Sequence, residues 1–202
     1  MEERRPEIWV IRHGETDWSR EGRHTGRTDV ELTTNGERQS LAIGRRLGGR
    51  GFALVLSSSL RRARDTCRLA GYGGAAEVTD LLREWDYGAY EGRTTAEIQH
   101  EAPGWTIWTG DLPGGETAEE VGDRADRVIE RAVSEAGDSA LFGHGHLMRV
   151  LAARWLGLSP RAGRLFALDT ASIGVLGYEH DARVIRAWNL TVDGDSGAGL
   201  SN

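Results

Sequence analysis

The sequence predicts an α/β fold, a three-layer sandwich with a mostly parallel central sheet and helices on both of its faces. Three short apolar runs, at residues 8–11, 52–56 and 139–142, indicate buried parallel strands. Segments with helical periodicity lie between these runs, as crossovers between parallel strands require. We expect residues 1–190 to form a single domain and residues 191–202 to form a mobile tail.

The first strand ends in Arg12-His13-Gly14, and a polar loop follows it. The next helix is expected to begin at Thr34, with Glu37 completing a capping box, and to end at Gly48-Gly49. Its inward positions are predicted to be Leu41, Ile43 and Leu47.

The second strand runs into Ser57-Ser58-Ser59, and a further helix follows. The apolar stripe of this helix consists of Leu60, Ala63, Cys67 and Ala70. A weaker strand is expected near Glu77-Val78. Because Cys67 is the single cysteine, an intramolecular disulfide is impossible, and we expect this thiol to be packed against the sheet.

Residues 82–116 form a long irregular segment, which is expected to cover the site as a lid. Thr94 and Glu97 predict one short helix inside it. The segment is rich in aromatic side chains, namely Trp85, Tyr87, Tyr90, Trp105 and Trp108. We favour a role for these rings in the core of the lid over a role as a substrate platform.

Thr117 and Glu120 predict the start of a long amphipathic helix, and the strand at 139–142 follows it. This strand ends at Gly143-His144-Gly145, and the next helix is expected to end at Gly157. The runs at 173–178 and 184–188 flank a polar turn and predict an edge hairpin, through which a homodimer is possible.

Composition excludes several classes of function. The net charge of −6 and the pI of about 5.6 give no basic field for nucleic acid or an anionic membrane. All 25 basic residues are arginine, so a Walker-type phosphate loop and a Schiff-base lysine are excluded. We expect a cytoplasmic protein, because the chain has neither a signal-peptide pattern nor 18 consecutive apolar residues.

The polar ends of the three strands predict a phosphate site. The carboxyl ends of parallel strands share one edge of a sheet, so His13, His144, Arg12 and Arg62 are expected to converge there. Arginine offers a fork of N–H donors to phosphate oxygens, and glycines allow the backbone to approach the ligand. A small phosphorylated metabolite is therefore the expected partner.

A neutral imidazole in such a site can attack phosphorus and form a phosphohistidine. The leaving alkoxide then needs a proton, for which Glu84 is the preferred donor, with Asp86 and Glu91 as alternatives. Because the acid must be protonated while the imidazole is neutral, we expect a bell-shaped pH profile with an acidic optimum.

Four ordered motifs resemble the signatures of the histidine phosphatase superfamily, which is also called phosphoglycerate mutase-like. They are Arg12-His13-Gly14-Glu15-Thr16, Ser58-Ser59-Leu60-Arg61-Arg62-Ala63, Leu82-x-Glu84 with Gly88 and Glu91-Gly92, and Gly143-His144-Gly145. The resemblance implies a phosphoglycerate mutase-like fold, with His13 as nucleophile and Glu84 as general acid. It further implies that Arg12, Arg62 and His144 hold the phosphoryl group.

The resemblance also points to substrate contacts. Thr25-Gly26 occupies the place of a substrate loop, and Tyr87 lies in the loop that carries the acid. Ser19 stands where many members have Asn, so one contact differs. For His146 and His24, substrate contact and packing remain equally open. Arg61 is expected to be exposed or to give an auxiliary contact, and His100 and His180 are expected to be solvated.

Within the superfamily the sequence is similar to a branch of sedoheptulose-bisphosphatase-type sugar phosphatases and small bacterial acid phosphatases. The resemblance therefore implies hydrolysis of small phosphomonoesters, without a cofactor or a metal. Phosphoryl transfer of the phosphoglycerate mutase type is the first alternative. The others are a metallohydrolase, which would use His13, His144, His146 and a carboxylate, and a non-catalytic phospholigand-binding module.

Overall fold

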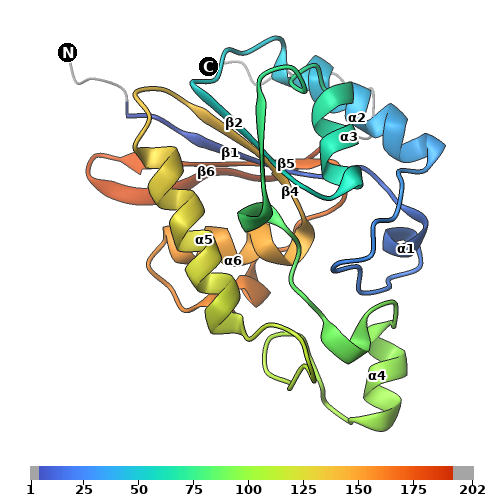
Figure 1. Ribbon diagram of the computed structural model, residues 1–202. Coiled ribbons are helices and arrows are strands. Elements are labelled where there is room, and N and C mark those ends of the chain that lie inside the picture. Colours follow the sequence, from blue (N-terminus) through green and yellow to red (C-terminus); the bar gives the residue numbers. More distant parts are fainter. Residues whose placement is uncertain (1–4, 193–202) are drawn as a thin grey trace.

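The computed structural model describes residues 5–192, so the predicted tail at 193–202 lies outside the described residues. A six-stranded sheet has the order β3-β2-β4-β1-β5-β6 (Figure 1). Its first four strands are parallel to one another, whereas β5 and β6 are antiparallel to their neighbours. The strands are β1 (Ile8–Arg12), β2 (Leu54–Ser58), β3 (Ala76–Thr79), β4 (Ser139–Gly143), β5 (Ser172–Glu179) and β6 (Ala182–Thr191).

Helices cover both faces of the sheet, as the sequence predicts. On one face α2 (Thr34–Leu47) and α3 (Arg61–Leu69) bury Ile43 and Cys67 against the sheet. On the other face α5 (Ala118–Val133) and α6 (Gly145–Trp155) form the larger core, which includes Val128 and Leu151. Figure 1 shows these two helical layers on opposite sides of the strands. The mostly parallel three-layer α/β architecture is therefore confirmed.

The parallel register brings the expected strand ends together. Arg12, the last residue of β1, lies beside Gly143, the last residue of β4. The backbone N–H of His13 donates to the Gly143 carbonyl at 3.0 Å. Strand β2 lies on the other side of β4, with Ser57 opposite Phe142. The polar residues that follow the three strands thus lie along one edge of the sheet.

Two boundaries differ from the predicted ones because of polar side chains that the apolar pattern does not register. Strand β2 covers Leu54–Ser58 and not 52–56, because both serines of this stretch lie inside the sheet and pair with their neighbours. Helix α2 is capped by Thr33 and not Thr34, since the Thr33 hydroxyl accepts from Gly36 N–H and leaves Glu37 outside a capping box.

Of the three positions of α2 predicted to face inward, Ile43 and Leu47 are buried as expected, but Leu41 is not. Leu41 is 46% exposed, whereas Gln39 and Ser40 are buried. The Gln39 carboxamide oxygen accepts from the Glu15 N–H, and Gly36 is packed against the chain at Glu15. This helix therefore directs a polar face toward the loop that follows β1. Hydrophobic periodicity does not predict that this polar face is buried.

The edge hairpin is present, but it is longer than predicted, since β5 and β6 extend to Ser172–Glu179 and Ala182–Thr191. Thr191 is thus a strand residue and not the start of a tail. Strand β6 lies at the edge of the sheet, and a homodimer through it stays a prediction.

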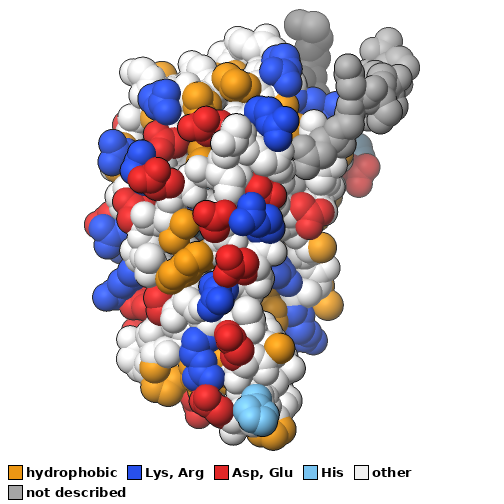
Figure 2. Space-filling model, turned by 90° about the vertical axis from the view of Figure 1, so that its right-hand side faces the viewer, with side chains coloured by type: hydrophobic (Ala, Val, Ile, Leu, Met, Phe, Trp, Pro, Cys, Tyr) orange, Lys and Arg blue, Asp and Glu red, His pale blue; other side chains and the backbone are white. Residues whose placement is uncertain are grey.

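Residues 82–116 follow β3 and hold the predicted short helix, α4 (Thr95–Glu101), whose N-terminus has the Thr94–Glu97 capping box. The segment begins beside the sheet, where Leu82 is buried in the core, and its later part with α4 lies at the lower end of the molecule in Figure 1. Among its aromatic side chains Trp85, Tyr87, Trp105 and Trp108 are buried. None of the helices within residues 5–192 is long and apolar enough to cross a membrane. Acidic and basic side chains are interspersed over the face that Figure 2 shows.

Candidate active site

A cavity of about 400 Å³ lies at the carboxyl end of β1, between the sheet edge and the lid segment. Arg12 and His13 come from the end of β1, Glu84 and Tyr87 from the lid, and Gly145 and His146 from the start of α6. The helix α1 (Asp17–Arg20) and the loop after it close another side. Segments that are far apart in the sequence therefore meet at the predicted phosphate site.

His13 is buried at this site in a defined tautomer. Its Nδ1 lies 2.7 Å from the Gly14 carbonyl oxygen, which can only accept a hydrogen bond. Nδ1 therefore carries the proton, and the lone pair of a neutral ring is on Nε2. Burial, together with the charges of Arg62 and Arg12, holds the pKa of His13 well below its ordinary value. The imidazole is thus neutral and nucleophilic at Nε2 even in mildly acidic solution.

Arg12 lines the same cavity with spare hydrogen-bond donors. Its Nη1 donates to the Leu168 carbonyl at 2.5 Å, while its buried Nε has no hydrogen-bond partner within the described chain. A Cβ on Gly145 would lie 3.2 Å from Cζ of Arg12, so glycine allows the guanidinium to lie against the start of α6. A buried donor without an acceptor is costly, and an anion in the cavity would satisfy it.

Arg62 and His144 lie directly behind the cavity and are fully buried. Nε of Arg62 donates to Nδ1 of His144 at 3.1 Å, so the other nitrogen of a neutral His144, Nε2, donates to the Ser58 hydroxyl at 2.8 Å. The rings of His13 and His144 are 5.2 Å apart. The four side chains predicted to surround a phosphoryl group therefore converge.

Arg62 is also bound to the backbone of the loop that follows α1. Its Nη1 donates to Thr28 O at 2.9 Å, and its Nη2 donates to Thr25 O and Gly26 O at 2.9 and 3.1 Å. Burial lowers the pKa of Arg62, and the carboxylate of Glu84 opposes this shift. Protein acceptors thus take four of the five guanidinium N–H groups, and no described residue accepts from the second N–H of Nη1.

The carboxylate of Glu84 lies at the N-terminus of α6 and lines the cavity. Its Oε1 accepts from the N–H groups of Trp85 and Leu147, both at 2.9 Å, and its Oε2 accepts from His146 N–H at 3.0 Å. Oε1 therefore has both lone pairs engaged, and Oε2 keeps one free. A proton on Glu84 resides on Oε2.

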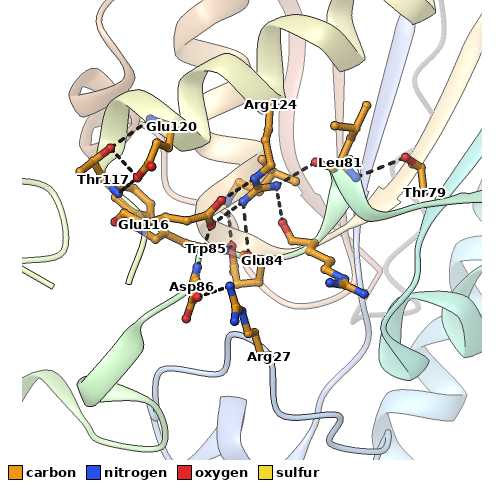
Figure 3. A network of polar contacts seen from close by, with 12 residues as sticks. Arg27, Thr79, Leu81, Glu84, Trp85, Asp86, Glu116, Thr117, Glu120 and Arg124 are labelled. Atoms are coloured by element: carbon orange, nitrogen blue, oxygen red, sulfur yellow. Dashed lines mark hydrogen bonds and ion pairs between the residues drawn. The ribbon is translucent and has the colours of Figure 1, made fainter. Parts of the chain in front are cut away.

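A network behind Glu84 fixes the course of the chain that carries it (Figure 3). Arg124 of α5 donates to the backbone carbonyls of Leu81, Arg83 and Glu84. The same guanidinium forms two hydrogen bonds to the Glu116 carboxylate, at 2.7 and 2.8 Å. Glu116 in turn accepts from the Asp86 N–H at 2.9 Å. Nothing in the spacing of the sequence indicates this role for Arg124.

Asp86 and Glu91, the two alternative donors, have structural partners. Asp86 pairs with Arg27 at 2.6 Å and accepts from Gly88 N–H. Glu91 accepts from the N–H groups of Gly26 and Thr28. Unlike Glu84, neither carboxylate is among the groups that line the cavity.

Of the residues predicted to contact substrate, some line the cavity and one does not. Thr25, Ser19, Tyr87 and His146 line the cavity, whereas Gly26 lies behind its wall with its N–H on Glu91 and its carbonyl on Arg62. The Ser19 hydroxyl and Thr16 form a reciprocal capping box on α1. Ser19 thus orders its own turn in addition to facing the cavity.

Two further histidines belong to the cavity wall. Nδ1 of His146 lies 2.6 Å from the Tyr87 hydroxyl, and the His24 ring packs 4.8 Å from the Tyr87 ring. Burial lowers the pKa of His146 well below its ordinary value, and it lowers that of His24 to about 4. Each ring is therefore packed and also faces the cavity, and its contact with substrate stays a prediction.

Sequence reasoning missed several lining residues. Arg149 lies one and a half turns into α6, with Cζ 4.6 Å from the centre of the Trp108 ring, and Arg23 follows α1. Helical periodicity places Arg149 on the polar side of α6, and only the fold of the lid brings it to the cavity. The described residues hold no group of three or more His, Cys, Asp or Glu side chains suited to a metal ion.

Comparisons with known proteins agree with this geometry. Residues 8–191 match the family model of the histidine phosphatase superfamily (branch 1). An acid phosphatase of Mycobacterium tuberculosis is 44% identical over 188 residues, which cover 91% of this chain and 92% of that protein. Sedoheptulose 1,7-bisphosphatase of Saccharomyces cerevisiae is 36% identical over 186 residues, covering 76% of this chain and 68% of that protein.

Among solved structures, the chain is similar to that of the open reading frame Rv3214 from Mycobacterium tuberculosis. The TM-score is 0.89 at 42% identity, and the match covers 94% of this chain and 100% of the other. The ordered motifs, the converging side chains and these likenesses have one common explanation: the chain belongs to the histidine phosphatase superfamily (branch 1).

Proposed function

We propose that this member of the superfamily hydrolyses small phosphomonoesters, such as sugar phosphates, through a phosphohistidine on His13. The observation that carries the proposal is the pairing of a neutral His13 with the unsatisfied donors of Arg12 in one cavity. A phosphoryl group there offers acceptors to the guanidinium and an electrophilic phosphorus to Nε2.

In the first step Nε2 of His13 forms a bond to phosphorus, while the bond between phosphorus and the ester oxygen breaks. The leaving alkoxide takes the proton from Oε2 of Glu84, the oxygen with a free lone pair. Arg12 and the remaining N–H of Arg62 stabilise the charge on the phosphoryl oxygens.

In the second step water attacks the phosphohistidine, and Oε2 of Glu84 accepts a proton from it. The bond between phosphorus and Nε2 then breaks, which releases inorganic phosphate and restores His13 and the protonated acid. The hydrogen bond from Nδ1 to Gly14 keeps the ring in the same tautomer throughout.

The cavity favours a compact leaving group with polar substituents. Thr95 and Thr106 provide hydroxyls on the side of the lid, Trp108 provides a ring face, and Arg149 provides a cation. The relatives named as an acid phosphatase and a sedoheptulose 1,7-bisphosphatase support a phosphatase that accepts sugar phosphates. Arg149 further favours substrates with a second anionic group.

The test compares Glu84→Gln and His13→Ala on a sugar phosphate and on an aryl phosphate. Loss of general acid catalysis lowers the rate of the first step roughly 10²–10⁴-fold. We expect this loss in the single-turnover release of the alcohol from the sugar phosphate, whereas single-turnover release of the phenol should fall much less, because a phenolate leaves without a proton. His13→Ala should abolish turnover of both and prevent transfer of ³²P to the protein. Equal loss of the single-turnover release rate on both substrates in Glu84→Gln contradicts the acid role, and isomerised substrate without free phosphate indicates a mutase.

A further inference from the structure

We propose that Glu91 is a positioning residue, which holds the loop at residues 25–28 in the form that fixes Arg62 against the phosphoryl group. The inference rests on the proposed role of Arg62 in binding that group. It assigns a function to a carboxylate that lies outside the cavity and that the proposed reaction does not use.

The first link is the contact between Glu91 and the loop. Gly26 N–H donates to both carboxylate oxygens, at 2.9 and 3.0 Å, and Thr28 N–H donates to Oε1 at 3.1 Å. Hydrogen bonds to an ionised acceptor are about twice as strong as neutral ones. A single side chain thus holds two backbone positions of this loop.

The second link runs from the loop to Arg62. With the N–H groups turned toward Glu91, the carbonyls of Thr25, Gly26 and Thr28 accept from the guanidinium of Arg62. These three acceptors, with Nδ1 of His144, determine how the planar guanidinium lies beside the ring of His13. Displacement of the loop would therefore release the cation that faces the developing charge.

The third observation is the close packing at the centre of the loop. A Cβ on Gly26 would lie 2.7 Å from Oε2 of Glu91 and 2.7 Å from the carbonyl oxygen of Trp85. The loop thus sits directly against both the carboxylate and the chain that leads from Glu84. Arg27, between the two held positions, is anchored to Asp86 at 2.6 Å but is largely exposed.

The experiment measures binding of orthovanadate, a phosphoryl mimic, to Glu91→Ala, Glu91→Gln and the control Glu97→Ala. Glu97 is a matched control, because its carboxylate also accepts from a backbone N–H in the lid segment, at Thr94, yet has no contact with Arg62. Kd is measured by intrinsic tryptophan fluorescence, which requires no turnover, and circular dichroism verifies folding. Turnover is then measured on one sugar phosphate and one aryl phosphate.

We expect Glu91→Ala to weaken vanadate binding at least tenfold and to lower kcat/KM by about 10²-fold on both substrates, as small displacements in a site do. Glu91→Gln keeps one acceptor oxygen, so its vanadate Kd and its kcat/KM should lie between those of Glu91→Ala and those of the parent. The values for Glu97→Ala should match those of the parent. Unchanged vanadate binding in Glu91→Ala and Glu91→Gln overturns the proposal. A loss that is confined to the sugar phosphate and equal in Ala and Gln overturns it as well, because a proton donor behaves in that way.

The failure of the proposed function has a different signature. If His13→Ala keeps full turnover, the phosphohistidine route is wrong, whereas the comparison of vanadate binding between the Glu91 and Glu97 variants is unaffected.

Discussion

Acid should destabilise this protein strongly between pH 6.5 and pH 5.5, because four histidines are buried in a form that resists protonation. The pKa values of His13, His144 and His146 lie well below the ordinary value, through burial first and neighbouring arginines second. Burial alone lowers the pKa of His24 to about 4. All four belong to the cavity or to the wall behind it.

The direction of the change in stability follows from the difference in proton uptake between the unfolded and the folded state. Well above pH 6.5, at about pH 7.5 and higher, neither state binds protons at these rings to a large extent, so they hardly affect the free energy of unfolding. Below pH 6.5 the unfolded chain takes up protons that the folded chain does not, and stability falls. For His24 the fall continues until about pH 4, where the folded state also becomes protonated.

The magnitude is about 1.4 kcal/mol for each histidine at pH 5.5, one unit below the unfolded pKa. Four such groups give roughly 6 kcal/mol, which is comparable to the whole stability of a typical domain, roughly 5–15 kcal/mol. Carboxyl groups titrate mainly below this range and contribute little to the change.

The assay is urea unfolding followed by circular dichroism at pH 7.5, 6.5 and 5.5, in buffers without phosphate, since a bound anion stabilises the folded state. His24→Asn should reduce the loss at pH 5.5 by about 1.4 kcal/mol, and replacement of His100, which is exposed on α4, serves as control. Equal stability at pH 7.5 and 5.5 would refute the idea of neutral, buried imidazoles and with it the basis for a nucleophilic His13 in acid.

Three further substitutions test the cavity and its supports. Arg149→Ala should raise KM about tenfold or more for a bisphosphate, through loss of a charged contact, and should change KM for an aryl phosphate much less. Gly26→Ala should lower stability by roughly 1–3 kcal/mol in thermal unfolding, because the added Cβ meets the Trp85 carbonyl. Arg124→Met leaves the Glu116 carboxylate and three carbonyls without their donor. It should lower the free energy of unfolding in urea by about 1–3 kcal/mol, and it should lower kcat for a sugar phosphate more than for an aryl phosphate. If a variant has the same KM, stability or kcat as the parent in its assay, the contact from which its effect was predicted does not have the role given to it.

The general position of the site could be predicted from the sequence, because it follows from topology. Parallel strands end at one edge, so Arg12, His13 and His144 had to meet wherever β1 and β4 are neighbours. Caps with a local hydrogen-bond pattern could also be predicted, such as those at Thr94 and Thr117.

Long-range polar support could not be predicted. Helix α2 buries Gln39 and Ser40 because they bind the loop after β1 and Thr66, and such a face has no hydrophobic period. The same limit applies to Arg124, whose three backbone carbonyl partners lie about 40 residues away along the chain. These contacts depend on which loops lie next to each other in the folded chain. Neither the spacing of residues nor their secondary-structure propensity contains that information.

The two arginines at the end of the cavity are held in different ways, and the difference bears on their roles. Arg62 has most of its donors on protein carbonyls, so its position is set before any ligand arrives. Arg12 has a single carbonyl partner and a buried Nε without one in the described chain, so it has more to gain from an anion. We therefore expect Arg12 to supply the larger part of the affinity for phosphate and Arg62 to supply a preorganised charge for the transition state.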